Sequence, residues 1–299
     1  MVPPPTADSW GPLLEVLPQG VVRIDAEGHC VEPNGSACRI LGRSREELLA
    51  TGFFDPAWTV LDSAGVRIPP DRYPGVQVLR TRVPVGQVRV GLQQDDGDVQ
   101  WLEVSAGPLA DGGVLMTFDD VTERHRTEAI LAARARIVER AAGSATLEEV
   151  LRSTLDEAEL LTGSCIGFFH FVEPDQRTLS LQAWSTRTAR DFCRAEGHGL
   201  HYPVDQAGVW TDALLALEPV IHNDYASLPH RRGLPEGHAE VLRELVVPVI
   251  RAGLAVALLG VGNKPFPYGP SDVDQVRRLA DLAWESAEHK RTQERHRLE

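Results

Sequence analysis

A continuous helical stretch in the middle of the chain separates two strand-rich parts. Residues 122–142 contain neither glycine nor proline. Small and apolar residues recur there at spacings of three and four, on one helical face: Ile130, Ala133, Ile137 and Ala141. A chain of 299 residues is too long for one average domain. The pattern therefore predicts two domains joined by a connector helix over residues 122–142.

The part before the connector has the pattern of an α+β domain. Short alternating apolar segments predict strands from Gly20 onward, and Ser44 with Glu47 forms a capping box that opens a helix. Three later segments, around residues 88–92, 99–104 and 114–118, predict antiparallel strands. Four prolines among the first twelve residues predict a flexible tail over residues 1–12. We therefore expect the first domain over residues 13–121.

The part after the connector predicts a second α+β domain over residues 143–288. Thr146 and Glu149 form a capping box, and apolar runs over residues 166–172, 179–184, 245–250 and 254–261 predict antiparallel strands. The last helix carries a stripe with heptad spacing, which is typical of a seam between two helices: Val273, Val276, Ala280, Ala283 and Ala287. Residues 289–299 then predict an exit helix that is cut short.

Charge and cysteine usage exclude several classes of function. Thirty Lys and Arg against 43 Asp and Glu give a net charge of −13, which argues against nucleic-acid binding. No apolar run is long enough for a membrane span and the N-terminus lacks an export pattern, so we expect a cytoplasmic protein that does not bind membranes. The four cysteines show no CxxC spacing, and we expect neither disulfides nor a metal site: Cys30, Cys38, Cys165 and Cys193.

The first part resembles a PAS domain over about residues 13–124. The resemblance rests on Gly20-Val-Val-Arg-Ile-Asp25, on Asn34-Gly-Ser-Ala37 and on Asp120-Val-Thr122. In PAS domains this last triplet often passes into a signalling helix. The resemblance implies a ligand cavity, which we expect Arg23, Trp101 and Met116 to line, with Arg23 able to pair with an anionic ligand.

The second part resembles a GAF domain of a bacterial sensor subfamily, over about residues 141–288. The resemblance rests on Phe168-Phe-His-Phe171, His201-Tyr-Pro203, Ala207-Gly-Val-Trp210 and the segment from Pro219 to Tyr225. It implies a small-molecule pocket on one face of a central antiparallel sheet. The candidate ligand-binding residues are Trp184, Cys193, His201, Trp210, His222, Asn223, Asp224, Tyr225 and His238. Hydrogen bonding that only holds loops in place is the alternative role for His222 and Asp224.

In proteins that this chain resembles, PAS and GAF domains stand in tandem before a histidine kinase or diguanylate cyclase and form parallel homodimers through their helices. No kinase phospho-acceptor box, ATP-binding glycine motif or Gly-Gly-Asp-Glu-Phe is present. We therefore expect a sensory input module of a two-component or related system, which is not itself an enzyme and which signals to a covalently linked output domain. The expected signalling residues are Asp120, Thr122, Ile130 and Ile137, followed by Val273, Val276, Ala280 and Ala283.

Two alternatives to a metabolite sensor remain open at this point. One is a ligand-free dimerisation or interaction adaptor, in which Trp184 and Trp210 fill the pocket. The other is a haem-based redox or gas sensor, because Cys193 precedes His201 closely and some archaeal sensor kinases with similar GAF domains bind haem through a cysteine. The sequence does not name the cofactor. Flavin and bilin are disfavoured, since the Asn-Cys pair of flavin photoreceptors and the Cys-His pair of phytochromes are both missing.

Overall fold

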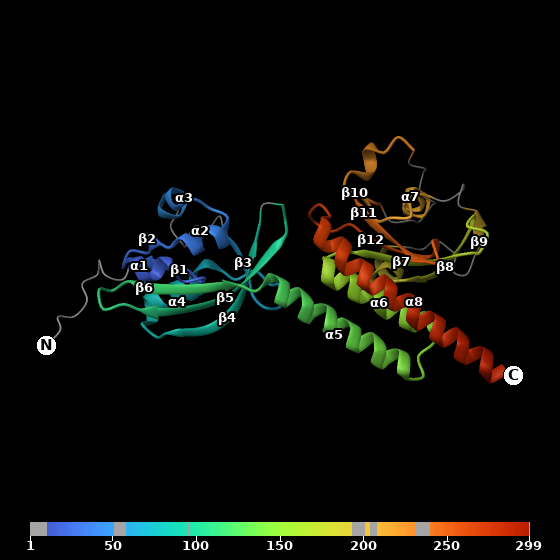
Figure 1. The fold of residues 1–299 in the computed structure, drawn as a ribbon, viewed down its shortest axis with the longest axis horizontal. Helices are drawn as coiled ribbons and strands as arrows, with labels where there is room; N and C mark the ends of the chain where they lie inside the picture. The colour runs from blue at the N-terminus through green and yellow to red at the C-terminus, as the bar shows by residue number, and fades with distance from the viewer. Residues whose placement is uncertain are drawn as a thin grey trace. The chain divides into compact units, whose positions relative to one another are not determined.

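The computed structural model describes residues 11–50, 58–94, 96–192, 201–203, 208–230 and 240–298 (Figure 1). The chain divides into two compact units, residues 1–126 and residues 127–299. Each unit is built around its own six-stranded sheet, so the predicted α+β class with two central antiparallel sheets and flanking helices is confirmed. Within the described parts of the chain, no helix is both long and apolar enough to cross a membrane.

The first unit forms a sheet with the strand order β2-β1-β6-β5-β4-β3, in which every neighbouring pair is antiparallel. The strands are β1 (Gly20–Ile24), β2 (Cys30–Pro33), β3 (Thr59–Leu61), β4 (Val85–Gln93), β5 (Val99–Pro108) and β6 (Val114–Asp120). The helices are α1 (Gly11–Glu15), α2 (Gly35–Leu41), α3 (Arg45–Ala50) and α4 (Pro74–Thr81), with a 3₁₀ turn η2 (Pro70–Arg72) before α4. The predicted capping box is present: the Glu47 amide donates to Ser44 Oγ at 3.1 Å, and the Ser44 amide donates to Glu47 Oε2 at 2.7 Å.

The second unit forms a sheet with the order β10-β11-β12-β7-β8-β9, again antiparallel throughout. Its strands are β7 (Ile166–Val172), β8 (Thr178–Trp184), β9 (His201–Pro203), β10 (Val220–His222), β11 (Glu244–Arg251) and β12 (Leu254–Gly262). Its helices are α5 (Thr122–Ala142), which begins in the first unit, α6 (Leu147–Thr162), α7 (Asp212–Ala216) and α8 (Pro270–Leu298). Short helical turns lie at η3 (Thr188–Phe192, a π-helix), η5 (Val209–Thr211) and η6 (Tyr225–Ser227).

The sheet of the second unit is buried on both faces. Side chains of successive residues in a strand point to opposite sides, so each strand contributes to two cores. One core lies between the sheet and the long helices α5, α6 and α8, and includes Phe169, Phe171 and Leu259. The other lies on the opposite face under α7, and includes Phe168, Leu258 and Leu214. This double burial explains why β7 is buried along its whole length.

The heptad stripe of the last helix lies inside the second unit. Val276, Ala280, Ala283 and Ala287 are buried in the core formed with α6 and the sheet, and Val273 packs against that core. Ile130 is also buried, and Ala133 and Ile137 of α5 belong to the same core. The stripe therefore packs within its own unit, against α6 and the sheet, and is not available as a seam between two copies of the chain.

The predicted domain boundaries can be compared with these units. The connector helix does not stand apart, because most of α5 packs into the second unit. Residues 289–298 continue α8 without a break, and Lys290 Nζ donates to the Gly143 carbonyl at 3.0 Å. The end of α5 and the last turns of α8 are thus tied together within one unit.

A glycine in β12 gives a test of this packing. A methyl group at Gly260 would overlap the Phe168 ring, whereas one at Gly269 would meet no atom within 4 Å. We expect Gly260→Ala to lower the free energy of unfolding of the second unit by about 1–3 kcal/mol, because the ring must move. Urea unfolding measures the loss, and Gly269→Ala serves as control with a change within about 0.5 kcal/mol. Equal stability of the two variants contradicts the packing described here.

Candidate functional site

The face of the second sheet that lies under α7 carries a cluster of aromatic rings. Phe168 and His170 project onto it from β7, and their ring centroids are 5.4 Å apart. Trp184 at the end of β8 lies 6.2 Å from Phe168, and Trp210 of η5 lies 6.3 Å from Phe168 and stacks on His170 at 6.3 Å. Aliphatic residues from the neighbouring strands and from α7 complete this buried cluster: Leu179, Ala213, Leu214, Val246 and Leu258. We call the cluster the aromatic face.

His170 brings a polar ring into the aromatic face. Its side chain is buried, and burial lowers the pKa of the imidazole to about 3, so the ring is neutral at physiological pH. The Nε1 atom of Trp210 is also buried and has no hydrogen-bond partner in the described parts of the chain. A mostly apolar surface with a few polar atoms is the usual lining of a small-molecule site.

The candidate residues Trp184 and Trp210 therefore lie on the aromatic face. Cys193 and His238 lie outside the described residues, and only the backbone of His201 is described, paired with Ser180 at the sheet edge. His170 and Phe168 are site residues that the candidate set did not include. The signal for them was present, since Phe168-Phe-His-Phe171 places a histidine and an aromatic ring on the same side of a strand.

His222 lies beside this face, between two carboxylates. Its Nδ1 is 2.9 Å from Glu244 Oε1 and its Nε2 is 3.2 Å from Asp212 Oδ2. His230 Nε2 contacts the same Asp212 oxygen at 2.7 Å. The hydrogen bond with Glu244 raises the pKa of His222 above its ordinary value, against the opposing effect of burial. Asp212 and Glu244 were not among the predicted site residues. The pairing of β10 with β11 brings Glu244 beside His222, and Asp212 reaches it from α7.

Of the next three candidates, Asn223 and Asp224 form hydrogen bonds from their side chains to the backbone. Asn223 makes two hydrogen bonds to the backbone of Tyr268, at 3.1 and 2.7 Å. The Asp224 carboxylate accepts from the Ser227 amide at 3.3 Å, and Tyr225 is buried, with its amide donating to the Leu242 carbonyl at 3.0 Å. For Asp224 this contact is of the kind expected from the alternative role of holding loops, and Asn223 makes contacts of the same kind.

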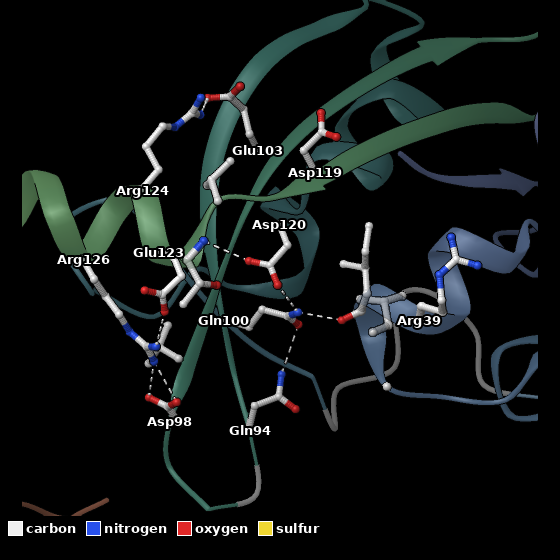
Figure 2. Close-up of a pocket in the computed structure, with 16 residues that line it drawn as sticks. Arg39, Gln94, Asp98, Gln100, Glu103, Asp119, Asp120, Glu123, Arg124 and Arg126 are labelled. Carbon is white, nitrogen blue, oxygen red and sulfur yellow. Dashed lines mark hydrogen bonds and ion pairs between the residues drawn. The ribbon is translucent and has the colours of Figure 1, made fainter. Parts of the chain in front are cut away.

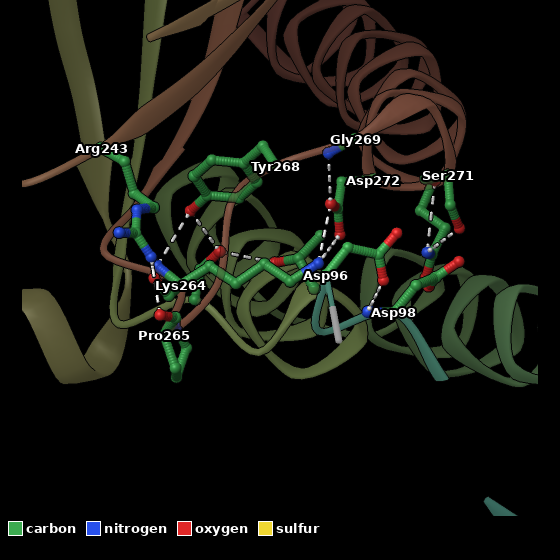
Figure 3. A network of polar contacts seen from close by, with 12 residues as sticks. Asp96, Asp98, Arg243, Lys264, Pro265, Tyr268, Gly269, Ser271 and Asp272 are labelled. Atoms are coloured by element: carbon green, nitrogen blue, oxygen red, sulfur yellow. Dashed lines mark hydrogen bonds and ion pairs between the residues drawn. The ribbon is translucent and has the colours of Figure 1, made fainter. Parts of the chain in front are cut away.

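The segment that Asn223 holds is the connection from β12 to α8. Lys264 Nζ lies 2.8 Å from Asp272 Oδ2, and both side chains are almost fully buried (Figure 3). The Tyr268 hydroxyl accepts from the Lys264 amide at 3.3 Å and lies 2.7 Å from Ser164 Oγ. Burial raises the pKa of this phenol, so it stays protonated and keeps its hydrogen bonds. These contacts fix the start of α8.

A second buried carboxyl supports the segment that follows β8. Glu159 of α6 accepts a short hydrogen bond from Ser185 Oγ, and Thr188 Oγ1 accepts from the Gly167 amide at 2.9 Å. Burial raises the pKa of Glu159. Nearby, Asp156 accepts from the Thr186 amide at 2.7 Å. Two carboxyl groups of α6 therefore hold the turn that leads into the π-helix η3.

The first unit has a partly open apolar cavity of about 60 Å³ between its sheet and the start of helix α4. Its lining includes Leu41, Trp58, Val60, Val90, Met116 and Phe118. The one hydroxyl in the lining, that of Tyr73, donates to the Trp58 carbonyl at 2.7 Å. Met116 lines the cavity as expected. Arg23 does not, since it lies on the surface and pairs with Asp111 at 2.5 Å; Trp101 does not either, since it stacks on His125 at 3.9 Å.

The predicted signalling residues Asp120 and Thr122 lie at an open polar groove of about 750 Å³, where β6 passes into α5 (Figure 2). The Asp120 carboxylate accepts from the Thr122 amide at 2.9 Å and from Gln100 Nε2 at 2.8 Å, and Gln100 also donates to the Ile40 carbonyl. Burial opposes ionisation of Asp120, but these hydrogen bonds lower its pKa below the ordinary value. The start of α5 is thereby connected to β5 and to α2.

On the following turn, Arg126 forms ion pairs with Asp98 at 2.8 Å and with Glu123 at 3.1 Å.

Among the residues that the structure describes, no group of three histidine, cysteine or acidic side chains is arranged to hold a metal ion.

Comparison with known proteins identifies both units. A family model for the PAS fold matches residues 14–126, and one for the GAF domain matches residues 144–286. The chain is therefore a tandem PAS–GAF module, with a PAS domain followed by a GAF domain. Over 209 residues it is 34% identical to the methyl sulfide methyltransferase-associated sensor of Methanosarcina acetivorans. That alignment covers 66% of this chain, and the chain spans about a fifth of the relative's length, 21%.

Solved structures with similar folds include the GAF domain of an Acinetobacter phosphoenolpyruvate-protein phosphotransferase. It is 17% identical, with a TM-score of 0.45 over 54% of this chain and 94% of that one. The chromophore-binding domain of a Stigmatella aurantiaca bacteriophytochrome is also 17% identical, with a TM-score of 0.38 over 90% of this chain and 93% of that one.

The neutral state of His170 gives a testable pH dependence. A histidine whose pKa falls from 6.5 to about 3 on folding stabilises the protein fully above pH 6.5, and this stabilisation is lost as the pH falls toward 3. We expect His170→Leu to remove this contribution, so that stability falls less steeply between pH 6.5 and pH 4. Urea unfolding of both proteins at a series of pH values measures the two slopes. Identical slopes contradict a buried neutral His170.

Proposed function

We propose that this chain is the sensory input part of a longer signalling protein. In this proposal a small molecule binds at the aromatic face, and the change is relayed through α8 to a covalently linked output domain, such as a histidine kinase or a diguanylate cyclase. The chain itself catalyses no reaction. The observation that carries the proposal is the arrangement of β7, whose consecutive residues contact the aromatic face on one side and α8 on the other.

The contacts of β7 give the relay a physical path. His170 belongs to the aromatic face, and the next residue, Phe171, projects to the opposite side. There its ring lies 5.8 Å from the Trp284 ring, and the guanidinium of Arg291 lies 3.7 Å above it. A ligand that displaces β7 or twists the sheet therefore acts directly on the last turns of α8. Closely packed elements tend to shift between discrete arrangements, which suits them to a switch.

The relative with 34% identity supports the sensory part of the proposal. It is described as a sensor, and the aligned region makes up about a fifth of it. A region that makes up a fifth of a longer protein leaves room there for further domains, as an input module requires. The tandem of PAS and GAF domains in this chain also supports a sensory role.

A second candidate function, the ligand-free adaptor, is favoured by one observation. Trp184 and Trp210 already pack against Phe168 at 6.2 and 6.3 Å, and so occupy part of the aromatic face themselves. In this reading the aromatic face is a core and not a site. The two functions differ in whether any small molecule stabilises the GAF domain.

An absorption spectrum of the purified chain, as isolated and after mixing with haem, separates these possibilities. The metabolite sensor predicts a featureless visible spectrum, followed by a rise in melting temperature with at least one compound of a metabolite library. A Soret band that moves in Cys193→Ala identifies a haem sensor instead. A featureless spectrum with no stabilising compound favours the adaptor.

We further propose that the chain forms a parallel homodimer through the outer face of α5. Leu131 and Val138 are 59% and 46% exposed there, and Ala135 and Ala142 are also exposed, so the four have the 4-3-4 spacing of a coiled-coil seam. Arg134 and Glu139 flank this face at positions that lie opposite each other in a parallel pair. Neither of them has an ion-pair partner among the described residues.

Charge reversal tests this dimer. We expect Arg134→Glu or Glu139→Arg to weaken dimerisation about tenfold, because two attractive contacts per dimer become repulsive. The double variant restores the wild-type Kd, and Arg277→Glu, an exposed change on α8, leaves it unaltered. Sedimentation equilibrium at low salt measures the Kd of each protein. An antiparallel pair predicts no rescue in the double variant, and a monomeric wild type contradicts the dimer.

A further inference from the structure

Four titratable side chains form a continuous chain beside the aromatic face. In order they are His230, from the turn after η6; Asp212, the first residue of α7; His222, the last residue of β10; and Glu244, the first residue of β11. Successive contacts measure 2.7, 3.2 and 2.9 Å. Imidazole and carboxylate therefore alternate along the chain, and each contact joins two different elements of the GAF domain.

The proton count at His222 follows from these contacts. An ionised carboxylate only accepts hydrogen bonds, and a neutral imidazole has a single N–H. Both ring nitrogens of His222 face a carboxylate, so a neutral ring leaves one of the two contacts without a proton. The His222 side chain is 10% exposed and that of Glu244 is 4% exposed, so little water reaches the Glu244 contact, whereas the Asp212 side chain is 27% exposed. The arrangement is satisfied when the ring is an imidazolium.

We infer that this chain of four residues is a proton-operated latch: protonated His222 ties α7 and the 228–230 turn to β11, and loss of the proton releases them. The inference goes beyond the proposed function and does not depend on a ligand at the aromatic face. The latch concerns how α7 covers the aromatic face, because Ala213 and Leu214 of α7 are part of that face.

The surroundings of His222 set the direction of the response. Among the described residues, the titratable groups that face its ring are Glu244 from β11, Asp212 from α7 and His230 from the turn, whose ring centroid is 6.4 Å away. The hydrogen bond with Glu244 raises the pKa of His222 above 6.5, and Asp212 acts in the same direction. A raised histidine pKa gives stability that is complete below pH 6.5 and is lost as the pH rises through the raised value. The latch therefore closes as the pH falls and opens as the pH rises through the raised pKa of His222.

Exchange of ring and backbone protons in the full chain tests the latch. Nitrogen-15 spectra of labelled histidine, with His222→Gln for assignment, follow the His222 ring from pH 6 to pH 10. Hydrogen exchange of the α7 amides, corrected for the intrinsic pH dependence, follows the release. We expect the ring to carry two protons at pH 7, and α7 exchange to rise about tenfold with the same midpoint as ring deprotonation.

Two variants separate the latch from a purely structural contact. In Glu244→Gln the amide pairs with a neutral imidazole, so we expect the pH dependence of α7 exchange to disappear while the fold is kept. If Glu244→Gln prevents folding, Asp212→Asn replaces the other carboxylate of His222, and we expect it to remove the pH dependence of α7 exchange in the same way. In His230→Gln both carboxylates of His222 are kept, so the inflection in α7 exchange persists.

A His222 ring that carries a single proton at pH 7 overturns the inference, and the wild-type titration is sufficient to show this. Exchange of α7 that has no inflection at the ring's midpoint overturns it as well. So does an inflection that persists unchanged in both Glu244→Gln and Asp212→Asn.

Discussion

The double burial of β7 is the constraint on which the GAF domain depends. Because neighbouring residues of a strand point to opposite faces, Phe168 and His170 enter the aromatic face, while Phe169 and Phe171 enter the core against α6 and α8. A shift of β7 that alters its packing in one core therefore also alters its packing in the other core. A cluster of rings at one face and a long helix at the other are thereby joined by a single backbone, which is the mechanical basis of the proposed relay.

The elements that flank this sheet are held by polar contacts, in contrast to its apolar centre. Lys264 with Asp272 fixes the start of α8, Glu159 with Ser185 fixes the segment after β8, and His222 with its two carboxylates holds α7. Buried polar groups of this kind are costly unless every partner is present. A change of proton or ligand at such a place therefore alters the position of a whole element and not only of a side chain.

Local features of the sequence were sufficient to predict the two domains, the hairpins and the capping boxes, since these depend on residues close together in the chain. Three site features required long-range contacts. The heptad of α8 marks a buried face but does not say whether the same chain or a second copy covers it. Arg23 alternates with buried neighbours in β1 and so points outward to Asp111, which is 88 residues away. His222 is brought beside Glu244 only by the pairing of β10 with β11.

Hydrogen exchange of the full chain, with and without the library compound that most raises the melting temperature, tests the relay most directly. The account predicts a change at α7 and β7 together with a change at residues 284–290 of α8, because Phe171 connects the two faces. Protection of α7 and β7 with no change in α8 would contradict the relay. Protection confined to the PAS domain would place the sensing event outside the aromatic face.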